Sequence, residues 1–270
     1  MAQVKALVIT GYGTNCEKEM AYACTYAGAL CDIVHLSDII DGSCSINDYH
    51  FLNLAGGFLD GDDLGSAQVE SIRIKHAQVL TTGKTLFDEI MCFIERGMII
   101  LGVCNGFQAL VKSGLLPGKP FGKRRVSLTF NDSAKFEDRW VRLAVNRNSP
   151  CVFTRDIDHL YLPVRHGEGK FVCDSGETLR EIQTSNMDAL YYTDETFTAT
   201  MDYPFNPNGS VESIAGICDE TGRIFGLMPH PEAFTHATNH PFWTRNHLSE
   251  EKGEGMALFD NAVRYLKGTV

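Results

Sequence analysis

The sequence predicts an α/β fold in which helices cover both faces of a mostly parallel, doubly wound sheet. Apolar, β-rich runs such as VKALVIT (residues 4–10) and MIILGV (98–103) are typical of strands buried on both faces. Helix-like segments separate these runs, and an alternation of strand and helix favours parallel pairing. The second half instead contains successive short strands, so we expect an added antiparallel section there.

The first half supplies the alternating elements. Residues 17–29 predict a helix because acidic residues lie in its first turn, where they complement the positive end of the helix dipole. The other helices follow from apolar residues at helical spacing, and the strands from short apolar runs. The expected strands are Val4–Thr10, Cys31–Leu36, Phe51–Ala55 and Met98–Val103. The expected helices are Glu17–Ala29, Gln68–Leu80, Leu86–Arg96 and Asn105–Ser113.

The second half is expected to be richer in strands. Two of them flank the turn-rich stretch DETGR, which is typical of a hairpin. The expected strands are Val126–Asn131, Trp140–Val145, His159–Val164, Ala189–Thr193, Ile214–Cys218 and Ile224–Met228, followed by a closing helix at Gly255–Leu266. We find no internal repeat, low-complexity tract or long linker, so one domain over residues 1–270 is predicted.

Composition narrows the class of protein. The chain has 270 residues, 44% of them hydrophobic, and a net charge of −10. The negative net charge argues against nucleic-acid binding, because clustered Lys and Arg are needed to neutralise phosphates. No apolar run approaches the roughly 18 residues that would span a membrane. The first residues enter a strand-like run directly, without the pattern of a signal peptide. These observations predict a cytoplasmic protein.

The nine cysteines do not form a metal or disulfide framework in the sequence. None of them forms a C-x-x-C pair, so no structural zinc site and no resident metal are expected. Their odd number and scattered positions argue against a set of disulfides. Most of them are expected to be small buried hydrophobic residues.

Cys104 is the cysteine whose surroundings suggest chemistry. It lies in LGVCNGFQ (residues 101–108), where a strand meets a helix, and Gly102 and Gly106 allow a sharp bend and close approach of a substrate. Such an elbow projects a nucleophile above the sheet edge. The helix N-terminus favours the thiolate, and the Asn105 N–H is placed to stabilise an oxyanion. The turn alone is equally compatible with a buried cysteine in an inert α/β protein.

A cysteine nucleophile needs a base, and His230 is the strongest of the nine histidines as a candidate. It follows the predicted strand 224–228 in the stretch PHPE, where prolines are expected to keep the chain extended. In an extended chain, residues i and i+2 point the same way, so Glu232 can accept the second N–H of the imidazole. Alone, the PHPE stretch would favour a polar residue in a proline turn over a catalytic His230. Together with Cys104, the catalytic interpretation is favoured.

A second oxyanion donor is predicted in the loop after the third strand. This loop contains Gly56 and Gly57 in AGGFLDGDDLG, and it leaves the same sheet edge as the Cys104 elbow. A glycine N–H there could approach the carbonyl under attack. A flexible glycine loop without a catalytic role is the alternative.

These motifs, in their order along the chain, resemble those of class I glutamine amidotransferases. GGF, GVCNGFQ and PHPE carry the general resemblance. GYGTNCEKE, HGEG and NPNGS narrow it to the glutaminase components of phosphoribosylformylglycinamidine synthases, an enzyme family of purine biosynthesis. The resemblance runs from about residue 4 to the closing helix. One departure is the loop after GGF, which reads LDGDDLG where this family is expected to have SYGD.

The resemblance implies hydrolysis of L-glutamine through a thioester on Cys104. Gly57 and Asn105 would hold the oxyanion with their backbone N–H groups. His230, oriented by Glu232, would protonate the departing ammonia and then activate water.

The resemblance also implies the substrate and partner contacts. Gln108 would help to hold the main-chain charges of glutamine, and further substrate contacts are expected from Gly56, Phe58 and His166. Ammonia would pass to a synthetase subunit, with a third small subunit as an open question. ATP and Mg²⁺ are expected at that synthetase subunit, because this chain has no phosphate-binding motif of the GxxxxGK[ST] type and no cofactor is predicted for it.

Several alternatives remain open from the sequence. The chain could serve another acceptor, act as a stand-alone cysteine hydrolase of related fold, or be a non-enzymatic subunit that kept the fold. The HGEG stretch (His166–Gly169) is either near the site or partner interface, or an ordinary glycine turn. The basic stretch Lys119–Arg125 is expected to be a solvated loop, with a docking patch as the minority interpretation.

Overall fold

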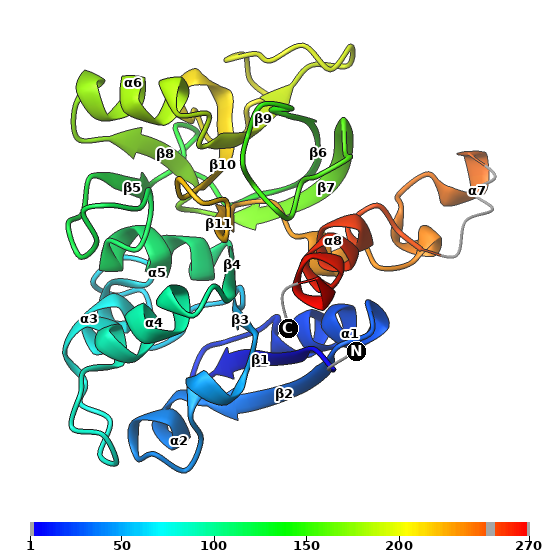
Figure 1. Cartoon of the computed structure of the whole chain (residues 1–270). Helices are drawn as coiled ribbons and strands as arrows, with labels where there is room; N and C mark the ends of the chain where they lie inside the picture. The colour runs from blue at the N-terminus through cyan, green and yellow to red at the C-terminus, as the bar shows by residue number, and fades with distance from the viewer. Residues whose placement is uncertain (1–2, 247–251, 269–270) are drawn as a thin grey trace.

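The computed structural model describes residues 3–246 and 252–268, and a nine-stranded sheet dominates them. The strands appear as a curved layer through the middle of the molecule in Figure 1. In spatial order they are β2 (Leu30–His35), β1 (Lys5–Thr10), β3 (Phe51–Leu54), β4 (Ile99–Val103), β11 (Ile224–Leu227), β10 (Ile214–Cys218), β9 (Asp188–Thr193), β6 (Glu137–Val145) and β7 (His159–His166).

The sheet changes direction at the pair β11–β10. From β2 to β11 every neighbouring pair is parallel, and from β11 to β7 every pair is antiparallel. The hairpin that makes the change is closed by Asp219, whose carboxylate accepts hydrogen bonds from the N–H groups of Arg223 and Ile224. The predicted parallel sheet with an antiparallel section is confirmed, and a separate antiparallel ribbon of β5 (Val126–Thr129) and β8 (Lys170–Cys173) accompanies it.

Helices cover both faces of the parallel part. Helices α1 and α8 lie together on one face, whereas α3, α4 and α5 lie on the other (Figure 1). The described helices are α1 (Glu17–Tyr26), α2 (Leu36–Ile40), α3 (Gln68–His76), α4 (Leu86–Glu95), α5 (Asn105–Ser113), α6 (Gly176–Thr184), α7 (Trp243–Asn246) and α8 (Met256–Lys267). None of them combines the length and apolar character needed to cross a membrane.

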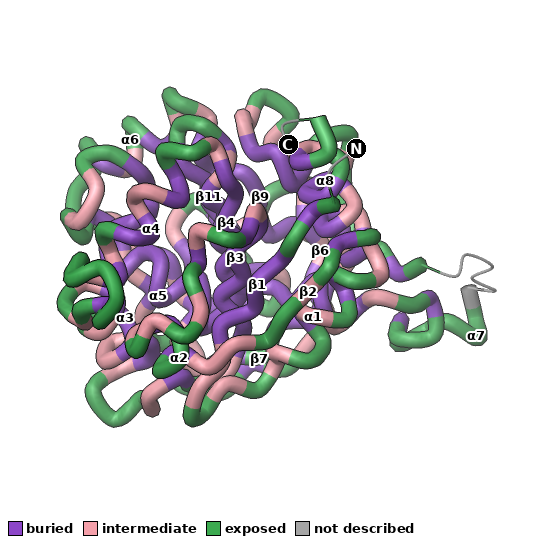
Figure 2. The backbone as a smooth tube through the Cα atoms, turned by 60° about the horizontal axis from the view of Figure 1, so that its bottom comes forward, coloured by how far each residue is buried: buried purple, intermediate pink, exposed green. Residues whose placement is uncertain are grey.

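The core lies between these layers. Every residue of β3, β4, β10 and β11 is buried, while the edge strand β2 has none that is fully buried. Figure 2 shows central strands in purple and exposed segments around them in green. Strands covered on both faces are continuously apolar, which is why these strands were visible in the sequence.

Three helices and one strand were not predicted, namely α2, α6, α7 and β8. Helix α6 has a clear start, because the Ser175 side chain accepts a hydrogen bond from the Thr178 N–H, but only Thr178 and Ile182 of the helix are buried. So little burial leaves a weak apolar pattern in the sequence. Helix α3 is also shorter than expected, because Ala77 already has an extended backbone.

Candidate active site

A cavity of about 320 Å³ lies at the carboxyl ends of the parallel strands. Loops that follow β1, β3, β4, β7 and β11 meet there, as expected for the ligand-binding edge of a doubly wound sheet. Its lining residues come from all five loops and include Cys16, Gly57, Cys104, Gln108, His166 and His230. The fold therefore gathers segments that are far apart in the sequence around one small space.

Cys104 occupies a strained turn between β4 and α5. Its backbone has φ 53° and ψ −103°, a conformation that a non-glycine residue adopts at a cost of about 1–3 kcal/mol. The Cys104 N–H donates to the carbonyl of Leu227 in β11, which ties the turn to the neighbouring strand. The side chain is only 7% exposed, yet it lines the cavity. The predicted elbow is present, and it points into an enclosed space.

The two glycines that flank Cys104 have a different role from the one expected. A Cβ atom on Gly106 would lie 2.0 Å from the carbonyl oxygen of Leu54, and one on Gly102 would lie 2.6 Å from the carbonyl oxygen of Gly106. These glycines allow β3, β4 and α5 to pack closely beneath the elbow. The structure therefore requires Gly102 and Gly106 for close packing of the backbone rather than for the approach of a substrate.

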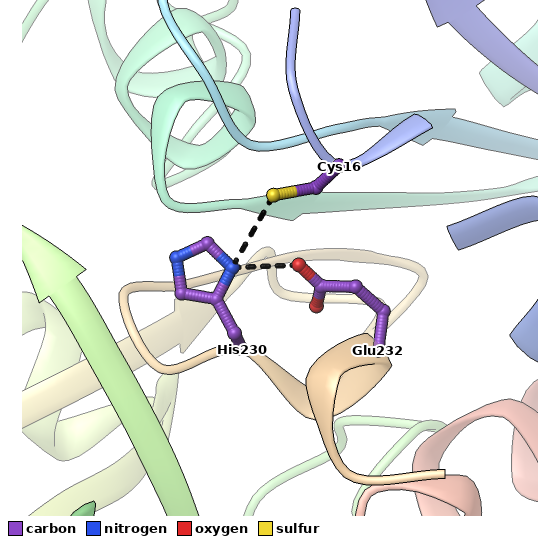
Figure 3. A group of neighbouring side chains, drawn as sticks. All are labelled: Cys16, His230 and Glu232. Atoms are coloured by element: carbon purple, nitrogen blue, oxygen red, sulfur yellow. Dashed lines mark hydrogen bonds and ion pairs between the residues drawn. The ribbon is translucent and has the colours of Figure 1, made fainter. Parts of the chain in front are cut away.

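His230 and Glu232 lie side by side (Figure 3), with His230 lining the cavity and Glu232 behind it. The distance from His230 Nδ1 to Glu232 Oε1 is 2.6 Å, and each residue is only 2% exposed. The carboxylate accepts the Nδ1 proton, so Nε2 is the ring atom available for chemistry, and it has no hydrogen-bond partner in residues 3–246 and 252–268. This is the orientation that a base beside Cys104 needs.

The charge state of His230 is set by opposing effects. Burial lowers the pKa of His230, but the negative charge of Glu232, the nearby Cys104 and Cys16 thiols and the hydrogen bond with Glu232 raise it, and the balance lies well above the usual value. A histidine in this environment favours the imidazolium form. It can therefore hold a proton next to the Cys104 thiol.

The route by which Glu232 reaches His230 differs from the expected one. His230 itself is extended, with φ −103° and ψ 91°, but Pro231–Ala233 forms a short 3₁₀ turn. Proline suits the first position of such a turn because its fixed φ is already helical and its missing N–H is not needed. The predicted pair is thus confirmed as a contact, whereas the predicted extended backbone is wrong after His230.

The glycine loop is held in place by the segment that follows β1. Gly57 has φ 134°, and the Phe58 N–H donates to the Gly13 carbonyl at 2.8 Å. The N–H groups of Asn15 and Cys16 both donate to the Gly56 carbonyl at 3.1 Å. Three backbone hydrogen bonds therefore connect the glycine loop to the segment after β1.

Asn105 connects this loop with the elbow. Its side-chain oxygen accepts a hydrogen bond from the Leu59 N–H at 3.1 Å, and its amide nitrogen donates to the side chain of Gln108 at the same distance. Gln108 in turn donates to the Glu168 carbonyl at 2.6 Å. One chain of hydrogen bonds thus fixes the glycine loop, helix α5 and the HGEG stretch relative to one another.

The HGEG stretch lines the cavity through His166, Gly167 and Glu168. Of the two alternatives left open by the sequence, the structure therefore favours a position near the site over an ordinary glycine turn. Asn131 donates its amide N–H groups to two backbone carbonyls, so its oxygen accepts from His166 Nδ1 at 3.1 Å. His166 Nε2 is then an unprotonated nitrogen, buried and without a partner in the described part of the chain. Burial, with a smaller effect of His230, lowers the pKa of His166 to about 3. This ring is neutral at ordinary pH.

The predicted site residues occupy two positions relative to the cavity. Cys104, His230, Gly57, Phe58, Gln108 and His166 line it. Gly56, Asn105 and Glu232 stand behind them, and Gly56 packs against the His230 ring so closely that a Cβ would lie 2.8 Å from its Cε1. All nine lie within one connected group of loops.

Sequence reasoning missed Cys16 and Arg165. Both line the cavity, and Cys16 Sγ lies 3.9 Å from His230 Nδ1. Cys16 follows the first strand at the same sheet edge as Cys104, and that position was the available signal. The basic stretch also needs a correction, because Arg125 is not solvated: it is nearly buried and pairs with Glu181 at 2.6 Å.

Comparison with known proteins agrees with these features. The profile described as the CobB/CobQ-like glutamine amidotransferase domain matches residues 3–266. A phosphoribosylformylglycinamidine synthase subunit PurQ of Dehalococcoides mccartyi is 43% identical over 99% of both chains. A protein of the same name from Methanococcus maripaludis is 41% identical over 97% of both chains.

A longer relative and a solved structure also match this chain. The phosphoribosylformylglycinamidine synthase of Schizosaccharomyces pombe is 32% identical over 97% of this chain, which corresponds to 20% of that protein. A chain of the Thermotoga maritima PurLQS structure superposes with a TM-score of 0.70 at 29% identity, covering 98% of this chain and 100% of that one.

Proposed function

This chain belongs to the CobB/CobQ-like glutamine amidotransferase family, and from that membership we propose that it is the glutaminase component of phosphoribosylformylglycinamidine synthase. Relatives of that name match it over nearly its whole length, which supports the specific assignment. Its role is to hydrolyse L-glutamine and to supply ammonia for a step of purine biosynthesis. The observation that carries the proposal is the buried His230–Glu232 pair beside the strained Cys104 elbow in one cavity.

In the proposed reaction, the Cys104 thiolate attacks the side-chain amide carbon of glutamine. Its proton rests on His230, whose raised pKa suits this task. The tetrahedral intermediate carries a negative oxygen, which the backbone N–H groups of Gly57 and Asn105 are proposed to hold. His230 then gives its proton to the departing ammonia, leaving a glutamyl thioester on Cys104. In the second half, His230 takes a proton from water, and hydroxide attack releases glutamate and restores the thiol.

Substrate contacts are proposed for the residues around the elbow. Gln108 and the HGEG stretch are joined through the Glu168 carbonyl, so they form one wall of the cavity. The glycine loop forms another wall through Gly57 and Phe58, and Gly56 lies behind it against the His230 ring. A cavity of about 320 Å³ has room for a single amino acid such as glutamine.

The proposed partner is a synthetase subunit that would receive the ammonia. Phe58, Phe130 and Phe136 line the cavity and are also exposed, so an apolar rim surrounds its mouth. A partner covering this rim would keep ammonia away from water, which protonates it. ATP and Mg²⁺ are proposed to bind that subunit, and a third subunit is suggested by the name PurLQS of the Thermotoga assembly. The single-domain organisation and the cytoplasmic location stay predictions from the sequence.

Reconstitution tests this proposal. The chain is mixed with a synthetase subunit, formylglycinamide ribonucleotide and ATP, and glutamate release from glutamine is measured. We expect weak release by the isolated chain and a strong increase with the loaded partner. Full activity of the isolated chain, unchanged by any synthetase, would instead favour a stand-alone hydrolase.

A further inference from the structure

Cys16, His230 and Glu232 bring three different metal-binding groups together (Figure 3). One ligand atom from each lies within 4.8 Å of the other two. Cys16 Sγ is 3.9 Å from His230 Nδ1, and Glu232 Oε1 is 2.6 Å from the same nitrogen. The catalytic scheme uses His230 and Glu232 but gives no role to the Cys16 thiol.

We propose that these three residues bind Zn²⁺ and that the bound ion switches the glutaminase off. Thiolate, imidazole and carboxylate are the ligands that zinc prefers, and three protein ligands with one open position form a common zinc geometry. A hard cation such as Mg²⁺ would instead require oxygen ligands. The ion is inhibitory and exchangeable, which distinguishes it from a resident cofactor.

The observed separations are close to those of a tetrahedral site. Zinc bonds of about 2.0–2.3 Å place an S and N ligand roughly 3.5 Å apart and an N and O ligand roughly 3.4 Å apart. The two separations of 3.9 and 2.6 Å would each change by less than about 1 Å to reach these values. Side-chain rotation of Cys16 and Glu232 is enough for such a change.

Two features leave the ligands free to move. Glu232 Oε2 is buried and has no hydrogen-bond partner in the part of the chain that the structure describes, so the carboxylate can turn toward a metal without losing another bond. A buried oxygen without a partner is also the group that gains most from a cation. The Cys16 side chain makes no capping hydrogen bond at the start of α1, and it lines the cavity through which an ion would enter.

Zinc at this position would stop the proposed acid–base chemistry. The ion takes the place of two protons, one from the Cys16 thiol and one from the His230 imidazolium, and both are released to solvent. With zinc on Nδ1, the remaining imidazole proton is on Nε2. That nitrogen can then no longer take a proton from Cys104 or from water. Glutamine hydrolysis stops, while the use of free ammonia by a synthetase partner is untouched.

Direct binding is tested without any activity measurement. Co²⁺ is titrated into the full-length Cys104→Ser protein, and the thiolate-to-cobalt charge-transfer absorption is recorded, followed by displacement with Zn²⁺. We expect saturable binding of one ion. A Cys104→Ser/Cys16→Ser protein should lose the charge-transfer band and bind at least about tenfold more weakly. The matched control is a Cys104→Ser/Cys173→Ser protein, which is altered at a half-buried thiol on β8. This control should keep the charge-transfer band and the binding strength of the Cys104→Ser protein.

Inhibition is measured on the reconstituted complex, with each variant compared with its own rate without metal. Zn²⁺ should inhibit the glutamine-dependent reaction but not the ammonia-dependent one, and Cys16→Ser should raise the inhibitory Zn²⁺ concentration at least about tenfold. Cys173→Ser should leave the inhibitory Zn²⁺ concentration unchanged. Equal binding in the two double variants, or binding that disappears with Cys104→Ser alone, would overturn the proposal and would place the metal elsewhere. The cobalt titration gives its answer even if the proposed function is wrong.

Discussion

Because the Cys104 backbone is strained, two substitutions of this residue should differ in stability although both abolish activity. Because φ is 53° there, Cys104→Gly should relieve strain that Cys104→Ala retains, and the glycine variant should be the more stable of the two by about 1 kcal/mol. Both should lack glutaminase activity. Melting temperatures of the two purified variants provide the measurement. An alanine variant as stable as the glycine variant would show that the elbow is not strained.

His230 and Glu232 should contribute unequally to the rate. His230→Ala removes the acid and the base together, so glutamine hydrolysis should fall by about 10²–10⁴-fold or more. Glu232→Gln disturbs only the orientation and charge of the ring, so its loss should be smaller. Steady-state glutamate release in the reconstituted complex measures both. Near-normal turnover by His230→Ala would exclude it as the base.

His166 predicts a specific sensitivity to acid. Its pKa is lowered to about 3 in the folded chain, against roughly 6.5 when unfolded, so the unfolded state binds more protons between these values. Its contribution to stability is complete above pH 6.5 and is lost as the pH falls toward 3. At pH 5 the loss is about 2 kcal/mol.

A His166→Gln variant should escape this loss. The difference in free energy of unfolding between pH 7 and pH 5, measured by urea denaturation, should be smaller in the variant by about 2 kcal/mol. An identical pH dependence in the two proteins would mean that the ring is protonated or exposed to solvent in the folded state.

Single residues were predictable where chemistry and local pattern coincide. Cys104 lies in a strand-to-helix turn, and His230 and Glu232 are two positions apart, so short-range patterns were sufficient to find them. Cys16 contacts His230 across 214 positions of sequence, and only the folded sheet brings them together. The neutral tautomer of His166 depends on Asn131, which is 35 positions away.

At the scale of elements, the glycine loop after β3 has no room for a side chain at Gly57. A Cβ on Gly57 would lie 2.5 Å from the Asn15 nitrogen and 2.7 Å from the Gly13 oxygen, and its φ of 134° disfavours any side chain. Gly57→Ala should displace the loop and its proposed oxyanion N–H. The expected loss in kcat is about 10²–10³-fold.

Gly83→Ala is the matched control for this loop. Gly83 also has a positive φ, of 68°, but nothing lies within 4 Å of its Cβ position. It should lose a little stability and no activity. If Gly57→Ala retained normal turnover with a stable fold, the loop would not be an oxyanion donor.

Strands that are buried along their whole length were readily predictable. The buried strands β3, β4, β10 and β11 have strong apolar runs, and all four were expected. Helix α6 was missed because it buries few side chains. The 3₁₀ turn at Pro231–Ala233 was also missed, because proline fits both an extended chain and a first helical turn.

At the scale of the whole molecule, the order of the strands could not be deduced from sequence. Strand β11 lies next to β4, although about 120 residues separate them, and it carries His230 to the sheet edge beside Cys104. The sequence indicated a parallel and an antiparallel part but not the pair at which they join. That junction is what brings the base to the nucleophile.

The most direct test compares two nitrogen sources in the complete assembly. The chain is combined with its synthetase partner, ATP and formylglycinamide ribonucleotide, and product formation is followed with glutamine or with ammonium chloride. The wild-type complex should use both sources, and the Cys104→Ala complex should use only ammonia, at an undiminished rate. Continued use of glutamine by the Cys104→Ala complex, or failure of the wild-type chain to confer glutamine use on the synthetase, would contradict the account.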